Sequence, residues 1–199
     1  ADPLWISAVE RQMAEHAAAI HFARIDCLAH LDALIAAGAE DAAFPRAGLS
    51  VTPLLDAELP PDPHALEAAL RARWAAERGL DRAAGRTLTG PHRVDLDVIY
   101  SQKGSTGEQK ALLIGIVLAH ARLVAAMTGI APFLLLDEIA AHLDPDRRLA
   151  LFAHLDALGT QCFMTGTDPV LFAALERRAQ SVTGRDGRLS PGAAGGAAP

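Results

Sequence analysis

The stretch Phe133-Leu134-Leu135-Leu136-Asp137-Glu138 decides the fold class of this chain. Four apolar residues run directly into two carboxylates, and Leu143-Asp144 follow a few positions later. Ionised carboxylates at the end of a buried strand are costly unless they meet a metal, a partner or a shifted pKa. The pattern is typical of a Walker B strand, in which the first acid holds Mg²⁺ and the second polarises the attacking water. The stretch therefore predicts nucleotide chemistry in an α/β fold.

The bulk composition sets limits on the rest of the chain. Its 199 residues suffice for one sizeable domain or a domain with an appendage, and 51% apolar residues allow a real core. A net charge of −6 argues against a surface that coats DNA uniformly, but it allows a local basic face. No apolar run reaches membrane-spanning length, and Cys27 and Cys162 lie in apolar surroundings. These features predict a cytoplasmic protein with two buried thiols and no membrane partner.

Periodicity divides the chain into two parts with different character. Before residue 84, two helical patterns flank a proline-rich segment, and we expect a helical arm lobe at residues 1–84. Trp5 and Ile20 in the first pattern, and Leu66, Leu70 and Trp74 in the second, lie at helical spacing and are expected to pack in its core. After it, strands and helices alternate, which predicts a parallel or mixed sheet at residues 85–190, and the Ala/Gly/Pro-rich residues 191–199 predict a disordered tail. The expected helices cover 4–37, 63–78, 108–127 and 145–158. The expected strands cover 49–54, 87–89, 94–100, 133–136 and 161–165, with a hairpin at 180–189.

A polar loop at the start of the apolar helix is the second chemical signal. Ser105-Thr106-Gly107-Glu108-Gln109 places small residues at a helix N-terminus, where free backbone N–H groups and the helix dipole favour an anion. Simple capping of the helix by Ser105 or Thr106 explains the same residues, and both interpretations stay open. The loop is not a P-loop, because neither lysine of the chain is followed by Ser or Thr.

The order of these motifs resembles that of ATP-binding-cassette ATPases and, more closely, the RecF family of bacterial recombination-mediator ATPases. The polar loop, the apolar helix, the acidic strand and Leu143-Asp144 occur in the family's order. The segment Thr89–Asp95 resembles the family's T-G-P-H-R-x-D segment, and Gln161–Thr165 resembles its short strand after the Walker B region. The resemblance covers most of residues 87–175. It implies the C-terminal subdomain of an ABC-type ATPase head joined to a mainly helical arm.

The resemblance also implies roles for individual residues. Asp137 would coordinate Mg²⁺, and Glu138 would orient or deprotonate the hydrolytic water. The polar loop would contact the γ-phosphate of an ATP held by the partner subunit of a head-to-tail dimer, through Ser105, Thr106, Gly107 and Gln109. The segment at the dimer interface would be His142, Leu143 and Asp144. The position at which many relatives carry a switch histidine corresponds to Thr165 or Thr167, and both are candidate sensors.

Two departures from the family pattern have consequences. No G-x-x-x-x-G-K-[ST] motif occurs, although the family carries its P-loop before the arm. We therefore expect a C-terminal portion of a longer protein, with ATPase activity only in the full-length dimer and none in residues 1–199 alone. In addition, Lys103-Gly104-Ser105 is tight: either the loop is short here or residues are absent between Gly104 and Ser105.

The expected partners are ATP, Mg²⁺, double-stranded or gapped DNA, a second copy of the chain bound in an ATP-dependent homodimer, and recombination-mediator proteins. Such a protein would associate with the nucleoid. The most basic window of the chain is a candidate for contact with the DNA backbone, and a solvated helix face is the alternative. Its arginines are Arg71, Arg73, Arg78, Arg82, Arg86 and Arg93.

Two other functional classes remain. One is a different ABC- or SMC-type ATPase head, associated with transport or with chromosome organisation. The other is a non-catalytic structural domain, in which Asp137 and Glu138 form salt bridges with Arg147 or Arg148.

Overall fold

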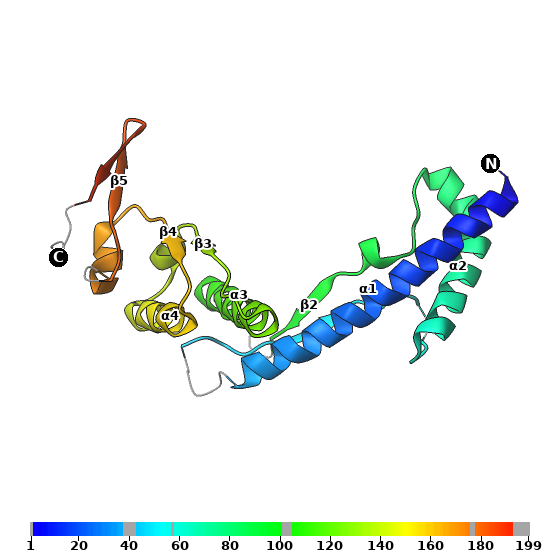
Figure 1. The fold of residues 1–199 in the computed structure, drawn as a ribbon, viewed down its shortest axis with the longest axis horizontal. Helices are drawn as coiled ribbons and strands as arrows, with labels where there is room; N and C mark the ends of the chain where they lie inside the picture. Colours follow the sequence, from blue (N-terminus) through cyan, green and yellow to red (C-terminus); the bar gives the residue numbers. More distant parts are fainter. Residues whose placement is uncertain (1, 38–42, 57, 101–104, 176–177, 193–199) are drawn as a thin grey trace. The chain divides into compact units, whose positions relative to one another are not determined.

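The computed structural model describes residues 2–37, 43–56, 58–100, 105–175 and 178–192, which form two compact units (Figure 1). Unit 1 comprises Ala1–Ala33 and Ala47–Ser101, and unit 2 comprises Leu34–Arg46 and Gln102–Pro199. The division at residues 101–102 lies later in the chain than the predicted boundary between residues 84 and 85. The reason is strand pairing, since residues 96–99 pair with residues 48–51 and so stay with unit 1.

Helix α2 (Pro63–Ala84) forms the packing face of unit 1 together with α1 (Pro3–Ala37). Asp62 caps α2 by accepting a hydrogen bond of 3.0 Å from the backbone N–H of Ala65. Leu66, Leu70 and Trp74, predicted at helical spacing, are all buried against α1. The sequence therefore predicts the inward face of this helix correctly, although α2 extends beyond the expected end at residue 78.

Helix α1 buries a different face from the one predicted. Its buried apolar residues are mainly alanines, with Ala14, Ala17 and Ala18 at the centre of the unit 1 core. Trp5 is 62% exposed and Ile20 is 42% exposed, although both were expected in the core. Alanine recurs so often along α1 that apolar residues occur on most of its sides. Periodicity therefore cannot identify the side that packs.

Strands β1 (Gly48–Val51) and β2 (Leu96–Ile99) form an antiparallel pair in unit 1, with Leu49 opposite Val98. The predicted strand at residues 87–89 is absent, and Pro91–Arg93 forms a short 3₁₀ helix instead. Gly90 enters this turn with φ 150°, a conformation that favours glycine.

The core of unit 2 lies between two helices and a parallel pair of strands. Helices α3 (Thr106–Thr128) and α4 (Pro145–Leu158) lie side by side (Figure 1), and β3 (Leu134–Leu136) pairs with β4 (Cys162–Met164). Phe152 and Leu151 of α4 are almost fully buried in this core. The predicted alternation of strands and helices is confirmed here.

Short elements complete unit 2. The 3₁₀ helices Ile139–His142 and Pro169–Leu175 follow β3 and β4 respectively. The predicted hairpin is confirmed, since β5 (Val182–Arg185) and β6 (Arg188–Pro191) pair antiparallel around Asp186-Gly187. Most of the predicted tail, residues 193–199, lies outside the described residues.

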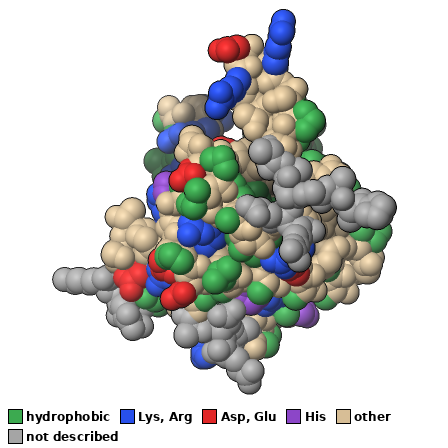
Figure 2. All heavy atoms as spheres, turned by 90° about the vertical axis from the view of Figure 1, so that its left-hand side faces the viewer, with side chains coloured by type: hydrophobic (Ala, Val, Ile, Leu, Met, Phe, Trp, Pro, Cys, Tyr) green, Lys and Arg blue, Asp and Glu red, His purple; other side chains and the backbone are tan. Residues whose placement is uncertain are grey.

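The apolarity of α3 and the exposure of the two cysteines differ from expectation. Helix α3 is long and apolar enough to span a membrane by length and composition, with a mean hydropathy of 1.9, contrary to the prediction that no run reaches that length. Ala111, Ile114, Leu118 and Ala121 of α3 pack in the core of unit 2, whereas Leu113 and Met127 are 62% and 76% exposed. Cys27 is exposed, and Cys162 is only partly buried. Figure 2 shows hydrophobic side chains at the surface, interspersed with charged ones.

Candidate functional site

The two carboxylates of the acidic strand lie where β3 ends. The β3–β4 register places Leu136 opposite Met164, and the backbone N–H of Thr165 donates to the carbonyl of Leu136 at 3.1 Å. The ladder therefore continues for one bond beyond the regular strands. Because the strands are parallel, the next residues, Asp137 and Thr165, leave at the same edge of the pair.

The two faces of β3 have opposite environments. Leu134 and Leu136 are buried in the core, whereas Leu135 is 78% exposed. Side chains alternate along a strand, so Asp137 emerges on the exposed face with Leu135. A charged carboxylate at this position keeps its contact with solvent and with any ligand at the strand end.

Glu138 adopts a backbone conformation that is unusual for a residue with a side chain. Its φ of 52° and ψ of 18° lie in the left-handed region. A continued strand would have placed Glu138 on the buried face with Leu136. The left-handed turn ends the strand and starts the 3₁₀ helix Ile139–His142, which leaves the Glu138 side chain half-buried. Non-glycine residues in this region are concentrated at functional sites.

The hydroxyl of Thr165 joins the two acidic residues. It donates a hydrogen bond to Oδ1 of Asp137 and accepts one of 3.0 Å from the backbone N–H of Glu138. Thr167, the other candidate sensor, is exposed. The structure thus brings Thr165 together with the predicted acids.

The salt bridges of the structural alternative are not formed. Arg147 donates through Nε to the carbonyl of Ala43 at 3.0 Å and lies 3.5 Å from Oδ2 of Asp144. Arg148 donates to the carbonyl of Ala140 at 3.4 Å. Within the described residues, the two acids at the end of β3 form no ion pair. Their charges remain available for another role.

The donor set at the end of β3 fits a magnesium site that is only partly made of protein. The described residues contain no group of three or more His, Cys, Asp or Glu side chains that could hold a metal. Mg²⁺ in nucleotide sites is typically held by one or two carboxylates together with phosphate oxygens and water. Asp137 can supply such a carboxylate, with Glu138 directly beside it, so the acids match a site that nucleotide phosphates complete.

The polar loop before α3 is a helix cap in this structure. Oγ of Ser105 accepts from the backbone N–H of Glu108 at 3.4 Å, and Oε2 of Glu108 accepts from the N–H of Ser105 at 2.7 Å. This reciprocal capping box confirms the capping interpretation. Thr106 and Gln109 are exposed at the same helix end. The tight Lys103-Gly104 segment lies outside the described residues.

The segment after the acidic pair has mixed exposure. Asp144 caps α4 by accepting from the backbone N–H of Arg147 at 2.9 Å, and both Asp144 and His142 are exposed. Leu143 is only 6% exposed and belongs to the core of unit 2. The Leu143 side chain therefore packs inside its own unit, and its role at an interface stays a prediction.

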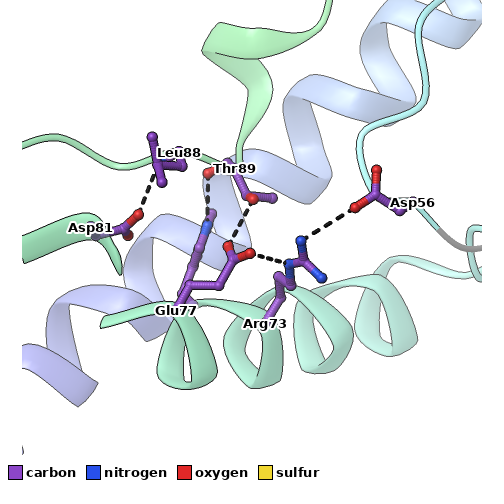
Figure 3. A network of polar contacts seen from close by, with 7 residues as sticks. Asp56, Arg73, Glu77, Asp81, Leu88 and Thr89 are labelled. Atoms are coloured by element: carbon purple, nitrogen blue, oxygen red, sulfur yellow. Dashed lines mark hydrogen bonds and ion pairs between the residues drawn. The ribbon is translucent and has the colours of Figure 1, made fainter. Parts of the chain in front are cut away.

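Two of the six arginines in the basic window are occupied by acidic partners. Arg73 lies 2.7 Å from Glu77 and 3.3 Å from Asp56 (Figure 3). Arg78 donates to both carboxylate oxygens of Glu10, at 2.6 Å and 2.5 Å, and these hydrogen bonds raise the pKa of its guanidinium. Both arginines therefore contribute to the packing of unit 1, and their contact with DNA stays a prediction.

The other four arginines have no side-chain hydrogen bond or ion pair within the described residues. All four side chains are exposed, and all four therefore remain candidates for phosphate contact. They are Arg71, Arg82, Arg86 and Arg93.

The T-G-P-H-R segment has structural contacts that sequence reasoning missed. The indole N–H of Trp74 donates to the carbonyl of Thr89 at 2.8 Å, and the Thr89 hydroxyl donates to Glu77 at 2.8 Å (Figure 3). Arg24 of α1 donates to the carbonyl of Pro91 at 2.8 Å. The turn therefore ties α1 and α2 together. Arg24 and Glu77, charged residues within the two helical patterns, were the available signal.

Comparisons with known proteins agree with the motif order. The chain is 52% identical over 195 residues to the "DNA replication and repair protein RecF" of Allorhizobium ampelinum, which covers 95% of this chain and 52% of the relative. It is 51% identical over 195 residues to the protein of the same name in Rhizobium meliloti, with the same coverage. The chain thus spans about half the length of these curated relatives. No family model matches it.

Solved structures give the same result for the fold. A structure of "the recombination mediator protein RecF-ATPrS in RecFOR pathway" aligns with a TM-score of 0.73 and 19% identity, over 96% of this chain and 51% of that one. A second, of RecF-ATP, aligns with a TM-score of 0.71 and 19% identity, over 97% of this chain and 52% of that one.

The fold of this chain is similar to about half of the solved RecF structures, and the predicted α/β fold class with a mainly helical arm is confirmed. The resemblance to RecF that the motifs indicated is confirmed over nearly the whole length of the chain.

Proposed function

We propose that this chain is part of a RecF-type protein of DNA replication, recombination and repair. The observation that carries the proposal is the pair Asp137-Glu138 at the end of β3, free of ion pairs within the described residues and tied to Thr165. Identity of about half to proteins named RecF supports the same role.

In this role, the acids contribute one half of an ATP site. Asp137 would hold Mg²⁺, which supplies charge neutralisation for the phosphates when bound, and Glu138 would orient the hydrolytic water. The described acids include no set that could hold the ion without phosphate ligands. Residues 1–199 contain no P-loop, so alone they should show no ATP hydrolysis.

Ser105, Thr106, Gly107 and Gln109 would contact the second nucleotide of an ATP-dependent homodimer. The exposed side chains of Thr106 and Gln109 at the N-terminus of α3 support this role. Ser105 contributes by capping the helix, which fixes the first turn of α3. Exposed His142 and Asp144 would lie near the same interface.

The expected substrate of the dimer is double-stranded or gapped DNA in the cytoplasm, at the nucleoid. The arginines without an acidic partner, Arg71, Arg82, Arg86 and Arg93, would contact backbone phosphates. Recombination-mediator proteins would be the further partners, in line with the RecFOR pathway named for the solved RecF structures.

The substitution Glu138→Gln in the complete protein tests the proposal. It should allow Mg·ATP binding, block hydrolysis and accumulate an ATP-bound dimer, measured by size-exclusion chromatography with light scattering and by phosphate release. Glu15→Gln, at an exposed residue of α1, removes the same charge and should change neither. A Glu138→Gln protein that hydrolyses ATP normally, or that remains monomeric with ATP, would contradict the ATPase role.

A further inference from the structure

We propose that Thr165 is a positioning residue for the acidic pair, which sets the direction of Asp137 and holds the left-handed turn at Glu138. This inference rests on the proposed ATPase function and assigns to Thr165 a different role from γ-phosphate sensing. It follows from the strand register, the hydroxyl contacts and the backbone conformation at the end of β3.

The register of β3 and β4 places Asp137 next to Thr165. Thr165 follows β4 as Asp137 follows β3, and the bond of 3.1 Å from Thr165 N–H to the Leu136 carbonyl keeps the two residues opposite each other. Leu135 and Phe163, two positions earlier, are paired and exposed at 78% and 56%. Alternation therefore directs the Asp137 and Thr165 side chains to that same face. The contact between them results from the pairing of two strands that share the core of unit 2.

The Thr165 hydroxyl is engaged both as a donor and as an acceptor. A threonine hydroxyl has one proton and two lone pairs. In Thr165 the proton goes to Oδ1 of Asp137, and one lone pair accepts the N–H of Glu138 at 3.0 Å. Thr165 therefore has no proton left to donate to a phosphate oxygen. A sensor of the γ-phosphate needs such a donor, so these contacts favour positioning over sensing.

The same hydroxyl also supports the left-handed turn at Glu138. A non-glycine residue with a φ of 52° is destabilised relative to an extended conformation. Because the Glu138 N–H leaves the ladder at this turn, it needs another acceptor, and Thr165 provides one. One hydroxyl thus orients a carboxylate and stabilises the backbone of the next acid. Misplacement of a catalytic group by about 1 Å can lower a rate about a hundredfold.

The test compares Thr165→Val, which removes the hydroxyl with little change in shape, with Thr165→Ser, which keeps it. Thr167→Val, at an exposed residue two positions away, is the matched control. The first measurement is amide hydrogen exchange at Glu138 in residues 1–199. Thr165→Val should speed this exchange about fivefold, the equivalent of one hydrogen bond, while Thr165→Ser and Thr167→Val should leave it unchanged.

The second measurement is ATP hydrolysis by the complete protein. Thr165→Val should lower kcat about tenfold to a hundredfold with the KM for ATP within about twofold, and Thr165→Ser should restore the rate. An unchanged kcat, unchanged Glu138 exchange, an increase in KM alone, or a Thr165→Ser protein as impaired as Thr165→Val would each overturn the inference. Wild-type protein without ATPase activity would instead overturn the proposed function, and with it the catalytic part of this inference.

Discussion

The division of the basic window into occupied and unoccupied arginines makes a quantitative prediction about DNA binding. Arg71 and Arg82 lie on α2 eleven positions apart, about three helical turns, and so project from the same side. Neither has an acidic partner within the described residues. Arg73 and Arg78, between them in sequence, are held by Glu77, Asp56 and Glu10. We expect Arg71→Gln/Arg82→Gln to weaken DNA binding and Arg73→Gln/Arg78→Gln to lower stability instead.

The size of the effect follows from counterion release. Each phosphate contact contributes about 0.9 to the slope of log K against log salt concentration. Loss of two contacts should flatten that slope by about 1.8, and at 0.1 M salt it should lower the affinity about 60-fold. The double change at Arg73 and Arg78 should leave the slope within about 0.5, although it removes the same charge.

The assay is fluorescence anisotropy of a labelled gapped duplex, titrated with the complete protein and ATP between about 0.05 and 0.3 M KCl. Thermal unfolding of each variant is measured in parallel, so that a loss of folded protein is not counted as a loss of binding. An equal change of slope in the two double variants would refute the reasoning, because the slope would then follow net charge rather than the availability of individual side chains. If the slope changes in neither double variant, this face of α2 is not part of the DNA site.

Three further predictions concern stability and reactivity. Phe152→Ala should lower the free energy of unfolding by about 3–5 kcal/mol in urea titrations, because Phe152 is 1% exposed in the core of unit 2; Leu149→Ala, at a residue 55% exposed, should change it by less than about 0.5 kcal/mol. Maleimide should label exposed Cys27 faster than Cys162, whose pKa is raised by burial, and equal rates at neutral pH would contradict the packing of β4. Burial, followed by the charge of a neighbouring arginine, lowers the pKa of His21 below 6.5, so the unfolded chain binds the proton more readily. Stability should therefore be full above about pH 6.5 and decline as the pH falls below it, and a His21→Gln protein should show less of this decline in thermal unfolding across pH 5–8.

The sequence predicts elements correctly where one pattern dominates. Leu66, Leu70 and Trp74 recur at helical spacing after Asp62, so the core face of α2 and its start follow from local rules, although the helix ends at Ala84 rather than at residue 78. The apolar run before Asp137 likewise predicts β3, because four apolar residues that end in acids fit few other environments.

The failures come from interactions between distant residues. The face that α1 buries depends on the close approach of α2 to small alanine side chains, and alanine content alone cannot indicate it. Glu10 is buried because Arg78 pairs with it across 68 positions. The sequence also predicted Thr165 only as a candidate sensor, because its contact with Asp137 joins residues that are far apart in the chain. Its contact with Asp137 depends on the register of two strands that are separated by a helix.

The exposed face of β3 and β4 has a consequence for the behaviour of this polypeptide in solution. Leu135 of β3 and Phe163 of β4 are 78% and 56% exposed, Phe133 directly before β3 is 72% exposed, and the sheet has two strands within the described residues. Parallel strands are normally covered on both faces, and an uncovered apolar strand edge is a template for self-association. Residues 1–199 prepared alone should therefore be prone to aggregation at high concentration. The solubility of this polypeptide would then be limited by β3, the same strand that carries the acidic pair.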